Sequence, residues 1–277
     1  MRLIVLLYFL PILALGQDVL DGAQPKAKLS YYVDLYSHAD QATISSSQDI
    51  LSFANKLQSK RQARNEKQFL HTLFVKTHQR YLKTFEDYAS FSELVNNGSY
   101  NCLSGTALYA LLLDHFGFEF KIIETNYHIF LLTSTNEGKV LFEATDPIHG
   151  FVDNENEIEK KLSGYKDQNT TVHASANNKT YYKYSVEIYN EIELDEMLGL
   201  FHYNLAIEAF NTHQLQSAVA HLDQANTLYH SPRIEEFSRL VLLSVLESKM
   251  EASAKENCVR KIQSIRKRQV NVIASAN

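Results

Sequence analysis

Apolar side chains recur at helical spacing in the first half of the chain. Residues 45–60 open with serines suited to a helix cap, and apolar residues follow at every third or fourth position. Residues 65–85 show the same period. A third apolar run begins at Cys102 and ends at Gly117, a residue type that suits a helix C-cap. The pattern predicts three helices, the last of them buried.

The pattern changes after this run to one typical of strands. Three short segments rich in β-branched and aromatic residues follow, and "TNEG" between the second and third predicts a hairpin turn; the segments are 118–126, 127–135 and 139–147. Helices followed by an antiparallel sheet predict an α+β domain over roughly residues 30–190.

Three segments of this domain have less regular patterns. Residues 29–40 are short and aromatic, which suits an edge strand or a packed loop. Residues 154–178 show no clear period and are expected to form a long polar loop, a kind of segment that is often functional, for example as a lid. Residues 179–189 are expected to add a strand to the sheet.

The last third of the chain, residues 194–268, has an entirely helical pattern. Small and bulky residues alternate there in a way that resembles a tetratricopeptide repeat, with Pro232 near the end of the unit. The residues that fit the repeat are Leu205, Ala206, Ala209, Ala218, Leu222 and Ala225. An ordinary helical hairpin packed on the first domain is the alternative.

The N-terminal sequence "MRLIVLLYFLPILALGQD" has the layout of a secretory signal peptide over residues 1–16. One arginine precedes a short apolar run, and small residues precede the expected cleavage site after Gly16. The run is shorter than the roughly 20 residues of a membrane span. We therefore expect export to a periplasmic, cell-surface or secreted location, with no stable membrane span after cleavage. An uncleaved anchor is the alternative.

The net charge and the motifs of the sequence indicate which partners and cofactors are expected. The chain of 277 residues carries a net charge of −5, which gives no reason to expect nucleic acid as a partner. The sequence contains no Gly-rich phosphate loop, no His-Glu-x-x-His pair and no Cys-x-x-Cys motif. We therefore expect no cofactor and no metal.

One of the two cysteines stands where a nucleophile would be useful. The unpaired N–H groups and the dipole of a helix N-terminus stabilise a thiolate, and Cys102 opens the third predicted helix. A small apolar core residue is the alternative interpretation. A disulfide with Cys258 is not expected, because the two cysteines belong to different predicted units.

A histidine and an aspartate follow on the predicted strands. His128 interrupts the apolar run "YHIFLL", and Asp146 ends the next strand in "FEATDP". If these strands pair across the "TNEG" turn, the aspartate is close enough to orient the imidazole, and the imidazole can take the proton of Cys102. A structural histidine and a simple Asp-Pro turn are the alternatives.

The segments "YNCLSGTALYALLLDHFG", "NYHIFLL" and "LFEATDP" resemble the transglutaminase-like superfamily over about residues 45–155. The resemblance implies a papain-type core in which Cys102 is the nucleophile, His128 the general base and Asp146 the orienting residue. No tryptophan is present to stabilise the transition state, as it does in some members. The backbone N–H of Cys102 would need a second donor, for which the candidates are Asn101, Gln79 and Tyr88.

The resemblance and the residues together favour an exported thiol enzyme. It would act on amide or peptide bonds through a thioester, which water or an amine resolves, and its substrate would be a protein or peptide. The alternative is a catalytically silent scaffold of the same fold, with the helical tail as the module that binds a protein partner. A redox-sensing thiol is a third hypothesis, for which Cys258 is poorly suited as the resolving cysteine.

Overall fold

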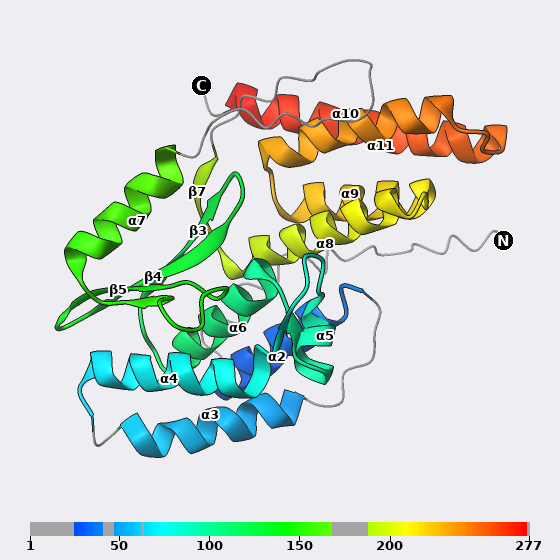
Figure 1. Ribbon diagram of the computed structural model, residues 1–277. Coiled ribbons are helices and arrows are strands. Elements are labelled where there is room, and N and C mark those ends of the chain that lie inside the picture. The colour runs from blue at the N-terminus through cyan, green and yellow to red at the C-terminus, as the bar shows by residue number, and fades with distance from the viewer. Residues whose placement is uncertain (1–24, 41–46, 62–63, 168–187, 276–277) are drawn as a thin grey trace, which may run out of the picture.

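The computed structural model describes residues 25–40, 47–61, 64–167 and 188–275, arranged as helices around a central sheet (Figure 1). The expected signal peptide lies outside these residues. The helices of the first part are α2 (Pro25–Ser37), α3 (Ser47–Arg61), α4 (Glu66–Tyr81), α5 (Phe91–Asn96), α6 (Cys102–His115) and α7 (Glu155–Asp167). The strands are β1 (Thr84–Phe85), β2 (Ser99–Tyr100), β3 (Phe120–Thr125), β4 (Ile129–Thr135), β5 (Gly138–Phe142), β6 (Phe151–Val152) and β7 (Tyr189–Ile192).

The main sheet is antiparallel and has the strand order β6-β5-β4-β3-β7. The predicted hairpin between β4 and β5 is confirmed: Thr135 pairs with Gly138, whose positive φ of 112° suits a residue without a side chain. The short strands β1 and β2 form a separate parallel pair beside the start of α6. The chain therefore has the expected α+β class.

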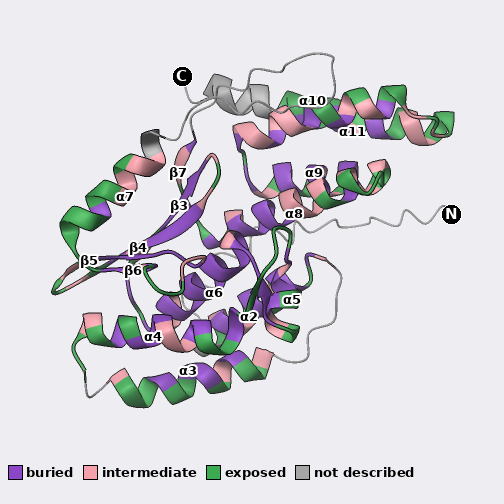
Figure 2. Ribbon diagram, viewed as in Figure 1, coloured by how far each residue is buried: buried purple, intermediate pink, exposed green. Residues whose placement is uncertain are grey.

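The two faces of the sheet are covered by different helices. On one face, apolar residues of the strands pack in the same core as α6, a helix whose residues 103–113 are all buried (Figure 2). Such a helix is apolar on every side because it has no solvent-facing surface. On the other face, Phe130 and Leu141 pack against Ile158 of α7. The sheet thus lies between α6 and α7.

Two segments form helices where the sequence pattern favoured other structure. Residues 29–40 were expected to form an edge strand or loop, but they belong mostly to α2, whose buried residues Leu29, Tyr32, Val33 and Tyr36 follow helical spacing. The expected loop 154–178 contains α7, because Ile158, Leu162 and Tyr165 fall on one side of a helix. The helix in 29–40 was not predicted because the segment is short and rich in tyrosine, and α7 was not predicted because few apolar residues stand among many polar ones.

The tail consists of α8 (Leu194–Asn211), α9 (Leu215–Leu228), α10 (Pro232–Glu247) and α11 (Ala252–Ser275). Pro232 occupies the first turn of α10, where its missing N–H has no intrahelical acceptor to lose. Buried residues of the tail belong to the same hydrophobic cluster as those of α2 and α6. The tail is therefore packed onto the sheet domain through a continuous core.

Of the expected strand 179–189, only its end falls among the described residues, where β7 begins at Tyr189. Among the described helices, none combines the length and apolar character that crossing a bilayer requires.

Candidate active site

The start of α6 is fixed by a reciprocal cap. The Asn101 side chain accepts a hydrogen bond from the Ser104 N–H at 2.9 Å, and the Ser104 hydroxyl accepts one from the Asn101 N–H at 3.0 Å. This capping box sets the direction of the helix. Cys102 is the first residue of the helix, and it is half-buried with a free thiol. The first turn of α6 leaves backbone N–H groups directed towards its surroundings.

The turn between β3 and β4 carries His128 to this thiol. The Thr125 N–H donates to the His128 carbonyl at 2.8 Å, and the His128 N–H donates to the Thr125 hydroxyl at 3.1 Å. One turn into α6, the Thr106 hydroxyl donates to the Ile129 carbonyl at 3.2 Å. These bonds hold the first turns of α6 against the start of β4, and Cys102 lies close enough to the His128 ring to help raise its pKa.

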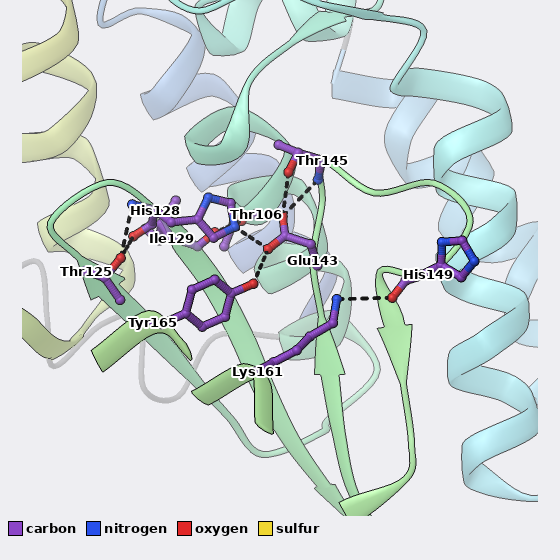
Figure 3. A network of polar contacts seen from close by, with 9 residues as sticks. All are labelled: Thr106, Thr125, His128, Ile129, Glu143, Thr145, His149, Lys161 and Tyr165. Carbon is purple, nitrogen blue, oxygen red and sulfur yellow. Dashed lines mark hydrogen bonds and ion pairs between the residues drawn. The ribbon is translucent and has the colours of Figure 1, made fainter. Parts of the chain in front are cut away.

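The carboxylate that holds the His128 ring belongs to Glu143. One oxygen of Glu143 contacts Nε2 of His128 and accepts a hydrogen bond from the Tyr165 hydroxyl at 2.9 Å (Figure 3). The other oxygen accepts bonds from the Thr145 N–H at 3.1 Å and hydroxyl at 2.7 Å. Glu143, itself fixed by Thr145 and Tyr165, is therefore the acid that orients the His128 ring.

Asp146 does not fill the orienting position that was predicted for it. Its carboxylate accepts hydrogen bonds from the N–H groups of Ile148 and His149, at 3.1 and 2.8 Å, and so caps a turn. Cys102 and His128 are brought together as predicted, whereas the acid beside the ring is Glu143.

The strand register explains this difference. Leu131 pairs with Phe142, so the next pair places Phe130 opposite Glu143, on the face of the sheet that α7 covers. His128 lies two residues before Phe130 and shares that face; the centroids of the two rings are 6.4 Å apart. The chain leaves the strand after Phe142, which puts Asp146 into the turn instead.

A tight loop keeps Glu143 in place. The Glu143 N–H donates to the Gly150 carbonyl at 2.8 Å, and the Gly150 N–H donates to the Asp146 carbonyl at 2.9 Å. A Cβ atom at Gly150 would collide with both the Glu143 and the Asp146 carbonyl oxygens. This position therefore requires glycine for the close backbone approach.

The electrostatics of the site favour a charged imidazole. Burial alone would lower the pKa of His128, but its hydrogen bonds with Cys102 and Glu143 and the charge of Glu143 raise it to about 9. Burial alone would raise the pKa of Glu143, but the bonds from His128 and Thr145 lower it below its usual value. Burial and the neighbouring Glu143 raise the pKa of Tyr165, so its hydroxyl stays a donor.

The structure does not place the three predicted oxyanion donors in that role. The Asn101 amide donates to the carbonyls of Asp87 and Ala89 at 3.0 and 3.1 Å, so its N–H groups are engaged. Gln79 is exposed on α4, where it accepts a bond from Lys76 at 2.8 Å. Tyr88 is 44% exposed, in the loop before α5. The N–H groups of the first turn of α6 are the donors that the local geometry offers.

Within the described ranges, no group of three or more His, Cys, Asp or Glu side chains could hold a metal ion. Comparison with protein-family models, with curated proteins and with solved structures finds no match to this chain.

Two residues of the site, Glu143 and Tyr165, were not predicted from the sequence. Glu143 was inconspicuous in an apolar run, although its alternation with Leu141 places it on the face that carries Phe130 and His128. Tyr165 lay in a segment expected to be loop. Its contact with the His128 ring, at 5.5 Å between centroids, depends on α7 packing across the sheet.

Proposed function

We propose that this protein is an exported thiol enzyme of the transglutaminase-like type, which acts on amide or peptide bonds of a protein or peptide. The observation that carries the proposal is the His128 ring, which contacts the Glu143 carboxylate and lies near the Cys102 thiol. A nucleophile, a base and an acid that orients the base are the minimum that acyl transfer through a covalent intermediate requires. A thiol-bearing helix followed by an antiparallel sheet also agrees with a papain-type core.

The first half-reaction starts from a thiolate–imidazolium pair, in which the proton of Cys102 resides on His128. The thiolate attacks the carbonyl carbon of the amide. Charge that develops on the carbonyl oxygen is stabilised by N–H groups of the first turn of α6. The C–N bond then breaks, His128 returns the proton to the leaving amine, and a thioester remains on Cys102.

The second half-reaction resolves the thioester. His128 takes a proton from water or from a second amine, whose oxygen or nitrogen attacks the thioester carbonyl, and the sulfur leaves and regains a proton. Water gives net hydrolysis of the amide, and an amine gives transfer of the acyl group. Glu143 keeps its negative charge throughout and stabilises the imidazolium.

Alkylation of Cys102 tests the proposal without a known substrate. In a Cys258→Ala background, iodoacetamide is expected to modify the native protein at about pH 6.5, through displacement of iodide by sulfur. We expect His128→Ala to slow this reaction at least about tenfold, because the imidazolium that stabilises the thiolate is lost. Equal rates with and without His128, or labelling only in denaturant, would favour the catalytically silent scaffold.

A substrate screen then separates hydrolysis from transfer. Quenched fluorescent peptides report amide cleavage, and incorporation of a labelled amine into a glutamine-containing peptide reports transfer. Cys102→Ala serves as the control in both assays, because a contaminating activity would survive that substitution.

A further inference from the structure

A second buried carboxylate lies one strand away from the site, where the tail meets the sheet. Glu124 of β3 is 1% exposed. The Tyr229 hydroxyl, from the end of α9, donates to one of its oxygens, and Nε of Arg233 in α10 lies 2.7 Å from the other. The Asn190 amide of β7 donates to the same tyrosine hydroxyl at 3.1 Å. Three segments of the molecule thus converge on one carboxylate.

The Arg233 guanidinium reaches beyond this cluster to the backbone of the β3–β4 turn. Its Nη2 donates to the Thr125 carbonyl at 2.6 Å and lies 3.4 Å from the Asn126 carbonyl. The Arg233 Cζ atom lies 5.6 Å from the centre of the Tyr203 ring, which packs against the guanidinium from α8. The side chain is 19% exposed, so these contacts are largely shielded from water.

The turn that Arg233 holds is the one that presents His128. Thr125 bonds Arg233 through its carbonyl and His128 through its N–H and hydroxyl. One residue therefore connects the tail to the backbone of the histidine. Without Arg233, the Thr125 carbonyl would lose its charged donor, and the turn would keep its internal bonds and the bond that the Ile188 N–H donates to the Asn126 side chain at 2.6 Å.

We propose that Arg233 is a positioning residue through which the helical tail holds the β3–β4 turn and sets the place of His128 beside Cys102. This inference rests on the proposed thiol chemistry. Arginine suits the role because its planar fork binds a carboxylate with one nitrogen and a carbonyl with another, whereas lysine offers a single point charge. The tail is then part of the active site's support and not only a module for partners.

The test separates positioning from folding by comparing two variants. In the Cys258→Ala background, Arg233→Lys keeps a positive charge near Glu124 but cannot span Glu124 and the Thr125 carbonyl together. We expect it to melt within a few degrees of the parent and to slow iodoacetamide modification of Cys102 about tenfold, since a small displacement of a catalytic group has large effects on rate. Arg233→Gln should slow it at least as much.

Two control variants match these changes. Arg239→Gln removes another arginine of α10, whose ion pairs with Glu235 and Glu236 lie at the surface, and should leave the rate unchanged. Tyr229→Phe removes a bond to Glu124 without touching the turn, and should lower the melting temperature while leaving the rate within about twofold of the parent.

The His128 ring resonances provide a readout that a purely structural role would not move. In folded Arg233→Lys, the ring carbon and proton shifts should move away from those of the parent, and in Arg239→Gln they should not. If Arg233→Lys keeps the parent rate and shifts while His128→Ala is slow, the positioning role is overturned and the thiol chemistry stands. If His128→Ala is as fast as the parent, the proposed function itself fails.

Discussion

Two buried carboxylates, Glu143 and Glu124, are built alike and behave differently. Each accepts a hydrogen bond from a tyrosine hydroxyl and faces a cationic side chain. The bonds of His128 and Thr145 overcome burial and lower the pKa of Glu143. Burial prevails over Arg233 and Tyr229 at the other carboxylate, and the pKa of Glu124 is raised.

The two carboxylates also differ in the kind of cation that each one faces. Arginine keeps its charge at any pH that the protein meets, so the Glu124 cluster is a permanent connection between the tail and the sheet. Histidine can gain and lose its proton, with a pKa of about 9 for His128, and the Cys102 thiol lies near its ring. The same arrangement of acceptors can thus support the fold in one place and proton transfer in another.

Removal of the thiol should have the largest effect on activity. Cys102→Ala is expected to lower turnover of any amide substrate by about 10⁴-fold or more, because no covalent intermediate can form. Stability should change by less than about 1 kcal/mol, since the side chain is small and half-buried. Cys258→Ala is the matched control. A Cys102→Ala protein that retains turnover would contradict the mechanism.

Exchange of each acid for its amide tests which carboxylate orients His128. Glu143→Gln should lower the pKa of His128 and slow turnover roughly 100-fold, because the imidazolium loses its counter-charge. Asp146→Asn should change the rate by less than about threefold, since its carboxylate caps a turn. Titration of the His128 ring by NMR and steady-state rates measure both effects. The reverse order would restore the role that the sequence predicted for Asp146.

The pH dependence of stability distinguishes the two cations. The pKa of His128 is about 9 in the fold against an ordinary value of 6.5, so its contribution is complete below pH 6.5 and is lost as the pH rises through 9. Urea unfolding of wild type and His128→Gln should therefore differ by about 3 kcal/mol more at pH 6 than at pH 10. The difference caused by Arg233→Gln should stay nearly constant over this range.

The two tyrosines should give the smallest effects. Tyr229→Phe is expected to lower the free energy of unfolding by about 2 kcal/mol, because the hydroxyl serves a buried carboxylate, and Tyr165→Phe by about 1 kcal/mol. Only Tyr165→Phe should alter the His128 titration. Chemical denaturation and NMR provide the two measurements, and a shift of His128 in Tyr229→Phe would contradict the expectation that loss of this hydroxyl leaves the Arg233–Thr125 bond in place.

Local patterns determined much of this molecule. The periodicity of apolar residues predicted α3, α4 and α6, and a Gly-containing turn predicted the β4–β5 hairpin. His128 was found because a polar ring interrupts an apolar run, and Cys102 was found because it opens a predicted helix. These features depend on residues close in sequence, so spacing alone reveals them.

Only the tertiary structure determined which carboxylate contacts His128 and which distant residues hold that carboxylate and the His128 turn in place. The choice of Glu143 over Asp146 depends on where β5 ends and on which face of the sheet His128 lies. Tyr165 and Arg233 reach the site from α7 and α10, separated from His128 by 37 and 105 positions of chain. Contacts of this kind arise when helices pack on a sheet, and local sequence period carries no information about them.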